Sequence, residues 1–136
     1  MNLEKIGVAG PTHYFLRPDG IIYTQSFEPT PITLAVFQAN FEFIKQLSEE
    51  RNEQLRMIIN IANASSLDKD ARNLIRSAHI QTHYGGYIAG VAILAANQLS
   101  RMIGNFMLGL RGKTLSPYPL KVFVQQEKAA NWLDAI

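Results

Sequence analysis

The segment Arg56-Met57-Ile58-Ile59-Asn60-Ile61 has apolar side chains at successive positions, without the alternation expected of a strand that has one face in water. Such a run is typical of a strand that is covered on both faces. The run from Tyr87 to Ala95 has the same character and is too short to cross a bilayer. We therefore expect two buried strands, centred on Ile59 and Ile93, to lie side by side in the interior.

Two amphipathic helices are predicted around the first of these strands. The earlier helix ends near Glu50, and either Thr30, followed by Pro31, or Thr33 is its N-cap. Its apolar stripe is Leu34, Phe37, Phe41, Ile44 and Leu47. After a short polar loop, Asp68 is expected to cap the later helix. The apolar stripe of that helix is Ala71, Leu74, Ile75 and Ala78.

Two further helices follow the second buried strand. Asn97 is the expected cap of the first of them, and Gly109 is its expected end. Its stripe is Leu99, Met102, Ile103 and Phe106. A short strand from Leu120 to Val124 then leads to a terminal helix. The inner residues of that helix are Ala129, Trp132, Leu133 and Ile136.

A β-hairpin is predicted near the start of the chain, because Pro18-Asp19-Gly20 separates the β-rich runs from His13 to Arg17 and from Ile21 to Gln25. Gly20 is expected to supply the positive φ of the turn. The alternation of strands and helices beyond the hairpin indicates right-handed crossovers and parallel strands. We therefore predict one α/β domain over residues 1–136, with a mixed sheet of about five strands, about four helices, and residues 1–11 loosely ordered.

Composition excludes several chemistries. The 136 residues include no cysteine, which removes disulfides, thiolate metal sites and thiol nucleophiles. The N-terminal segment lacks the basic and apolar regions of a secretory signal, so a cytoplasmic location is expected. Residues 1–68 carry five basic and eight acidic side chains, and residues 69–136 carry eight basic and three acidic ones. This polarity favours an acidic partner or a homodimer, whereas nucleic-acid binding is not expected, because its denser basic patches are absent.

Candidate binding residues lie where the two buried strands end, because open α/β sheets bind ligands beyond the carboxyl ends of their strands. They are Asn60, Asn63, Ser65, Ser66, Asp68 and Lys69 after the first strand, and Asn97 and Arg101 after the second. Arg72 and Arg76 would extend this surface as a basic stripe along the second helix, together with His79 and His83. The simpler interpretation, which we prefer, is that Asn and Ser complete turns and caps and that the stripe faces solvent.

No catalytic or metal-binding constellation is recognised. Ser65 and Ser66 lack a Gly-x-Ser-x-Gly elbow, and Gly85-Gly86 is not followed by the Gly-Lys-Ser/Thr of a phosphate loop. His79 and His83 have the i, i+4 spacing of metal ligands, but Gln81 stands between them and Arg76 would repel a cation. We therefore predict a protein that is not an enzyme and holds no metal or cofactor.

In the order of their predicted strands and helices, residues 30–136 resemble the anti-sigma-factor antagonist domains, also called the STAS or SpoIIAA-like family. Three parts of the sequence carry the resemblance. They are Met57-Ile58-Ile59-Asn60-Ile61-Ala62 with Leu67-Asp68-Lys69-Asp70-Ala71, then Gly90-Val91-Ala92-Ile93-Leu94-Ala95-Ala96-Asn97, and then Val122-Phe123-Val124 with Glu127-Lys128-Ala129-Ala130. The resemblance implies a SpoIIAA-like sheet and a regulatory domain that binds a partner protein through the loop and helix beginning at Asp68.

The sequence departs from that family at its phosphorylation switch. The family typically carries Asp-Ser-Ser-Gly at this helix start, where a hydroxyl is phosphorylated, whereas this chain has Asp68-Lys69-Asp70-Ala71. A protein-interaction domain without that switch is the leading hypothesis. The alternative is a protein of the same fold that binds a small molecule or lipid-type ligand.

Aromatic residues bear on both hypotheses. Phe37, Phe41, Phe106 and Trp132 are interpreted as core residues rather than a ligand pocket, because each lies on a helical stripe. In the hairpin, Phe15 and Tyr23 are expected to face a second subunit.

Overall fold

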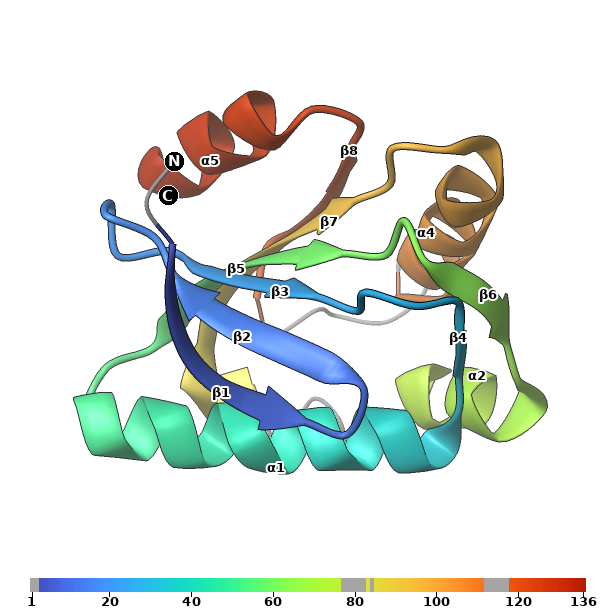
Figure 1. The fold of residues 1–136 in the computed structure, drawn as a ribbon, viewed down its shortest axis with the longest axis horizontal. Helices are drawn as coiled ribbons and strands as arrows, with labels where there is room; N and C mark the ends of the chain where they lie inside the picture. The colour runs from blue at the N-terminus through green and yellow to red at the C-terminus, as the bar shows by residue number, and fades with distance from the viewer. Residues whose placement is uncertain (1–2, 77–82, 84, 112–117) are drawn as a thin grey trace.

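The computed structural model describes residues 3–76, 83, 85–111 and 118–136, and its central feature is a six-stranded mixed sheet (Figure 1). The spatial order of the strands is β1-β2-β3-β5-β7-β8. Their bounds are β1 Glu4–Ala9, β2 Thr12–Leu16, β3 Ile22–Gln25, β5 Leu55–Asn60, β7 Ile88–Leu94 and β8 Leu120–Phe123. A separate two-stranded parallel sheet consists of β4 (Thr30–Ile32) and β6 (Ala64–Leu67).

The predicted hairpin is confirmed as β2 and β3, which pair antiparallel with His13 opposite Gln25. In the turn, the Gly20 N–H donates to the Arg17 carbonyl at 3.0 Å, and Gly20 has a φ of 84°. Asp19 accepts from the Arg17 guanidinium at 3.0 Å and from the Ile21 N–H at 3.2 Å. Partial burial alone would raise the pKa of Asp19, but these bonds lower it below its usual value.

The two central strands are also confirmed. Strand β5 lies between β3 and β7, is parallel to both, and places Ile59 opposite Ile93. Strand β8 adds to β7 in the same direction. Met57, Ile58 and Ile93 are almost completely buried, which explains why these strands show no polar alternation.

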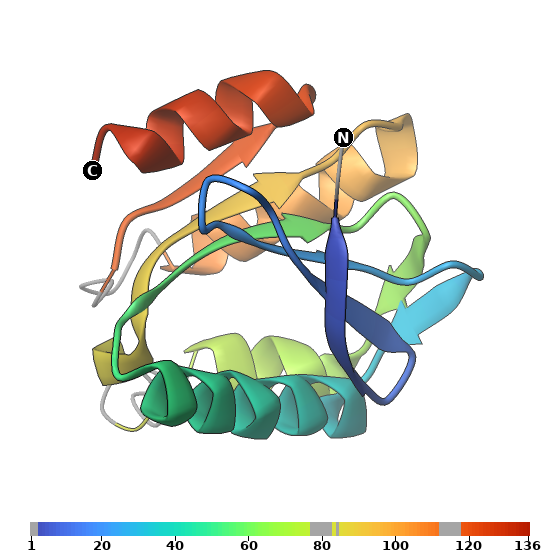
Figure 2. The same ribbon diagram turned by 60° about the vertical axis from the view of Figure 1, so that its left-hand side comes forward.

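Helices cover both faces of the sheet (Figure 2). On one face lie α1 (Leu34–Arg51), α2 (Lys69–Arg76) and α4 (Gln98–Arg111), and the larger apolar cluster lies between this layer and the sheet. Helix α5 (Gln126–Asp134) covers the other face through a second cluster that includes Ala129 and Leu133. No helix in the described ranges is both long and apolar enough to cross a membrane.

Side-chain caps set the starts of three helices. Thr33, rather than Thr30, caps α1, because its hydroxyl accepts from the Val36 N–H at 3.2 Å. Asp68 accepts from the Ala71 N–H at 2.8 Å at the start of α2. Asn97 accepts from the Ser100 N–H at 2.8 Å at the start of α4. These bonds satisfy N–H groups that a helix start otherwise leaves without a partner.

Three elements differ from the sequence-based expectations. Residues 4–9 are not loose but form β1, an edge strand held by β2. The polar segment before Asp68 contains β6, whose Ser65 and Ser66 are exposed because its sheet lies outside the main one. Gly109 does not end α4, which continues to Arg111, because a glycine ends a helix only where it leaves the helical conformation.

Gly7 offers a test of the packing between β1 and α1. A Cβ at residue 7 would clash with the Phe43 ring, whose centroid lies 4.4 Å from that of Tyr14, so the ring would have to shift within this contact. We predict that Gly7→Ala lowers the free energy of unfolding by about 1–3 kcal/mol, the usual cost of overpacking. The control is Gly86→Ala, since a Cβ there has no heavy atom within 4 Å. Urea unfolding curves measure both variants, and equal losses would contradict this packing.

Candidate functional site

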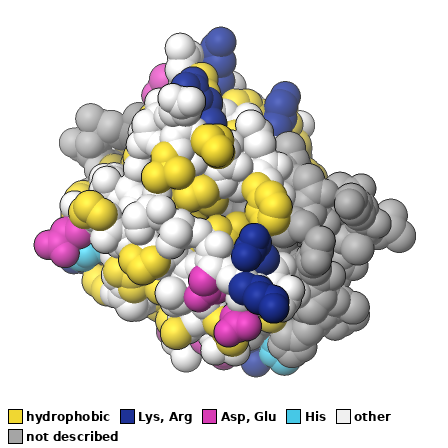
Figure 3. Space-filling model, turned by 90° about the vertical axis from the view of Figure 1, so that its right-hand side faces the viewer, with side chains coloured by type: hydrophobic (Ala, Val, Ile, Leu, Met, Phe, Trp, Pro, Cys, Tyr) yellow, Lys and Arg dark blue, Asp and Glu magenta, His cyan; other side chains and the backbone are white. Residues whose placement is uncertain are grey.

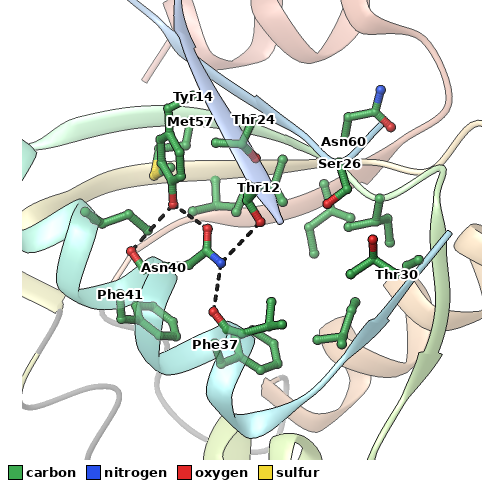
Figure 4. A pocket seen from close by; sticks show the side chains of 18 of the residues that line it. Thr12, Tyr14, Thr24, Ser26, Thr30, Phe37, Asn40, Phe41, Met57 and Asn60 are labelled. Carbon is green, nitrogen blue, oxygen red and sulfur yellow. Dashed lines mark hydrogen bonds between the residues drawn. The ribbon is translucent and has the colours of Figure 1, made fainter. Parts of the chain in front are cut away.

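A cavity lies inside the larger apolar cluster, between α1 and the main sheet (Figure 4). The space open to the centre of a water-sized sphere is about 140 Å³. A single water needs about 10–15 Å³ on this measure, so the cavity has room for a molecule of many atoms. Protein interiors ordinarily have few voids larger than one water.

The walls of the cavity are mainly apolar. Helix α1 contributes Phe37, Phe41 and Ile44, and the facing strands contribute residues such as Met57 and Val91. No Asp, Glu, Lys, Arg or His is among the described residues that line it. Sequence periodicity explains this arrangement, since spacings of three and four bring the α1 residues to one side of the helix and alternate strand residues share one face.

Several polar side chains line the cavity. Those of Tyr14, Asn40 and Thr12 form a hydrogen-bonded link between the sheet and α1. The Tyr14 hydroxyl donates to Asn40 Oδ1 at 2.6 Å, and Asn40 Nδ2 donates to the Val36 carbonyl at 2.7 Å and to Thr12 Oγ1 at 3.3 Å (Figure 4). Burial raises the pKa of Tyr14 well above its usual value, so its hydroxyl remains a donor at physiological pH. The link holds the middle of α1 at the distance set by a tyrosine side chain.

Two hydroxyls from β3 and the residue after it also line the cavity. Thr24 and Ser26 are two residues apart, so both side chains point to the face of the sheet that α1 covers. Thr24 is only 2% exposed. Within the described ranges, neither hydroxyl has a hydrogen bond to another residue, which leaves both free to bind a molecule in the cavity.

At one end of the cavity, beside the first turns of α1, several lining residues are only half-buried. Thr12, Ser26, Val36, Phe37 and Asn40 belong to that end. The opposite end is formed by buried residues, among them Ile88 and Tyr118. We expect a ligand to enter beside the first turns of α1.

The three asparagines predicted as binding residues make structural hydrogen bonds at the carboxyl ends of the strands. Asn60 turns its side chain away from the cavity (Figure 4) and donates to the Tyr23 hydroxyl at 2.7 Å. Asn63 Nδ2 donates to the Ser26 carbonyl at 2.7 Å. Asn97 Nδ2 donates to the Ala62 carbonyl, also at 2.7 Å. Of these, Asn60 and Asn63 border the cavity, and Asn97 does not.

The other predicted residues lie on the outer surface around α2 and the start of α4. Ser65, Ser66, Lys69 and Arg101 are exposed, and Asp68 serves as a helix cap. The guanidinium carbon of Arg72 lies 5.9 Å from the centroid of the Phe106 ring. The side chain of Arg76, and all of His79, fall outside the described part of the chain, and His83 is exposed. No cluster of three or more potential metal ligands occurs among the described residues.

The structure agrees with the predicted roles of some aromatic residues and differs for others. Phe41 is buried in the larger apolar cluster and Phe37 packs against it, as predicted, and both also line the cavity. Phe106 is 43% exposed on α4, so its assignment to the core is wrong. Trp132 packs against Phe123 in the second cluster. Tyr23 is buried within this chain, so it cannot meet a second subunit.

Sequence reasoning missed the cavity itself. Two signals for it were available, because Asn40 stands on the same side of the helix as the apolar stripe and Thr24 stands among the apolar residues of β3. Both positions face the core, where an apolar residue is the usual choice. A polar residue at a core position either bonds to another buried residue or contributes to a binding site. Asn40 bonds to Tyr14 and Thr12, whereas the Thr24 hydroxyl has no bond to another described residue.

The sheet order and its two helical layers place the chain in the class of SpoIIAA-like α/β folds. The structure is similar to that of an uncharacterised protein from Shewanella loihica PV-4, of the DUF3478 family with a SpoIIAA-like fold. The two share 15% sequence identity at a TM-score of 0.54, over 97% of this chain and 92% of the other. Residues 14–136 match a domain of unknown function, DUF7793, and the chain belongs to that family.

Another solved structure, a protein of unknown function from Arthrobacter sp. FB24, matches with 23% identity and a TM-score of 0.32, over 97% of this chain and 98% of the other. No curated protein matches the sequence.

The Tyr14 hydroxyl gives a pH test of the link to α1. An exposed tyrosine in the unfolded chain ionises near pH 10, whereas the raised pKa of Tyr14 keeps it protonated in the fold. Above about pH 10 the unfolded state therefore loses a proton that the folded state retains, and the free energy of unfolding falls as pH rises. We predict that this fall is shallower in Tyr14→Phe.

Near neutral pH the same variant should be less stable by about 1 kcal/mol, because Asn40 Oδ1 loses its donor. Denaturant unfolding at pH values between about 8 and 11 measures both effects. Parallel curves for the two proteins across that range would contradict the burial of Tyr14.

Proposed function

We propose that this domain binds a small, uncharged and largely hydrocarbon molecule in the cavity between α1 and the main sheet. The observation that carries the proposal is a cavity of about 140 Å³ inside the larger apolar cluster. An interior void costs stability, because the side chains around it lose contacts. A bound ligand restores those contacts, and a wall made mainly of apolar side chains favours hydrocarbon.

The charge of the lining supports an uncharged ligand. Burying an ionised group without a partner of opposite charge costs several kcal/mol or more. Since no acidic or basic side chain is among the described lining residues, an ionised ligand would have no such partner there. The proposal assigns binding alone to this site and no chemical step.

A mouth variant tests the proposal directly. Val36 is half-buried at the opening, and Ala35, the next residue, is exposed and lies outside the lining. We predict that wild-type protein binds the neutral dye N-phenyl-1-naphthylamine with a rise in fluorescence, and that Val36→Trp reduces its affinity at least about tenfold by filling the entrance. The control Ala35→Trp should bind as the wild type does. Absence of dye binding to the wild type, or equal binding by both variants, would reject the proposal.

A second candidate function, binding of a partner protein, is supported by an apolar strip on α4. Leu99, Met102 and Phe106 are 48%, 64% and 43% exposed, and their spacing places them on neighbouring turns of the helix. Arg72 lies against Phe106, and Arg101 is exposed on the same helix. On this side of the molecule, where α2, α4, β4 and β6 lie, apolar side chains alternate with charged ones (Figure 3).

Apolar contacts beside basic groups suit an amphipathic segment with acidic flanks, and we propose such a segment as the partner. The test is a comparison of proteins captured from a native lysate by the wild type, Met102→Glu and Arg72→Glu. We predict that both variants lose proteins that the wild type retains. The control is Phe27→Glu, because Phe27 is exposed but lies outside this strip. The same captured proteins on all four baits would count against the α4 strip.

A further inference from the structure

We infer that the molecule bound in the cavity is a neutral amphiphile, with a hydrocarbon body and one uncharged oxygen group, a hydroxyl or carbonyl, that binds the Thr24 hydroxyl. This inference rests on the proposed function and adds the chemical class and the orientation of the ligand. Thr24 carries this inference, because its neighbours on this face of the sheet are mainly apolar.

Thr24 belongs to a row of residues that crosses the sheet beneath α1. In this row Tyr14 pairs with Thr24, Thr24 with Ile59, and Ile59 with Ile93. The row ends at Val122 on β8. The Tyr14 hydroxyl is used by Asn40. Thr24 is thus the member of this row whose hydroxyl borders the cavity and has no hydrogen bond to another described residue.

A hydroxyl on the wall of a mainly apolar cavity, without a protein partner, gives up hydrogen bonds to bulk water on folding unless a molecule in the cavity replaces them. Valine has the same shape and would fit this row without that loss. The Thr24 hydroxyl borders the cavity, so a ligand oxygen there can supply the missing hydrogen bond. Since a hydroxyl both donates and accepts, either a hydroxyl or a carbonyl on the ligand satisfies it.

The neighbouring groups locate the polar end of the ligand near the opening. Ser26 lies two residues beyond Thr24 on the same face and is half-buried, and its hydroxyl is likewise without a partner among the described residues. The buried end of the cavity, near Ile88 and Val91, presents hydrocarbon. The ligand therefore extends its apolar part inward and keeps its oxygen beside Thr24 and Ser26.

The head group is uncharged for a reason specific to this end of the cavity. A carboxylate or phosphate would need a cationic side chain, and an amine would need an anionic one. Among the described lining residues, the polar side chains at this end carry hydroxyl or amide groups, as Thr12, Ser26, Thr30 and Asn40 do (Figure 4). Such groups satisfy an uncharged oxygen and leave an ionised head group unpaired.

Competition among three compounds with one hydrocarbon chain tests the inference. Decanol, decanoate and decylamine each compete with N-phenyl-1-naphthylamine for the protein near pH 8, where the acid and the amine are charged. We expect decanol to displace the dye at a concentration at least about tenfold below that of the other two. Decanoate or decylamine binding as tightly as decanol would overturn the inference.

Thr24→Val provides the matched variant, since it removes the hydroxyl and keeps the shape of the side chain. We expect decanol to bind it about 3- to 10-fold more weakly than it binds the wild type, as for one lost neutral hydrogen bond, while the dye binds equally well. Without ligand, the variant should unfold at the same temperature as the wild type or at a higher one, which shows that it is folded. Thr24→Ser keeps the hydroxyl and should retain the affinity for decanol.

The outcomes separate this inference from the proposed function. If the dye does not bind the wild type, the cavity is no binding site and both fail. If the dye binds but none of the three compounds displaces it, or if decanol binds Thr24→Val as it binds the wild type, the ligand class is wrong and the cavity remains a binding site.

Discussion

The parallel pairing of β5 with β3 on one side and β7 on the other is the constraint on which this structure depends. Parallel neighbours require crossovers, and right-handed crossovers lay helices against the faces of the sheet. The connections beyond β3 place α1, α2 and α4 on one face, and α5 after β8 closes the other. Both the buried strands and the amphipathic helices of the sequence follow from this arrangement.

The two faces of the sheet are packed in different ways. On the α5 side, small residues such as Ala92, Ala129 and Ala130 let the helix approach closely. On the α1 side, a long side chain from the sheet, Tyr14, meets Asn40 in the middle of the helix. The cavity lies beside this link, and the Phe37 and Phe41 rings of α1 form part of its wall.

Much of the fold was predictable from local patterns. The unbroken apolar runs around Ile59 and Ile93 indicated the central strands, and Asp68 and Asn97 marked helix starts through cap chemistry. Strand β1 was not predictable from its own residues, because it is an edge strand stabilised mainly by β2. The sequence periodicity also did not predict that Met102 and Phe106 are exposed. An apolar stripe shows that a helix is amphipathic but not what it packs against.

The cavity was less predictable, because its volume depends on how far α1 stands from the sheet, and that distance is a property of packing between elements remote in sequence. Tyr14 and Asn40 are 26 positions apart, and no local pattern connects them. Two of the binding residues predicted at the strand ends, Asn60 and Asn63, do border the cavity. Their side chains, however, make hydrogen bonds within the turns there.

The small β4–β6 sheet has a mechanical consequence. Strand β4 runs directly into α1, and β6 runs directly into α2, so the pairing of these strands fastens the beginnings of the two helices to each other. The Thr30 N–H donates to the Asn63 carbonyl at 2.8 Å, and the Asp68 N–H donates to the Ile32 carbonyl at 3.1 Å, one fastening at each end. The starts of α1 and α2 are therefore joined directly through β4 and β6, by a path that does not run through the central sheet.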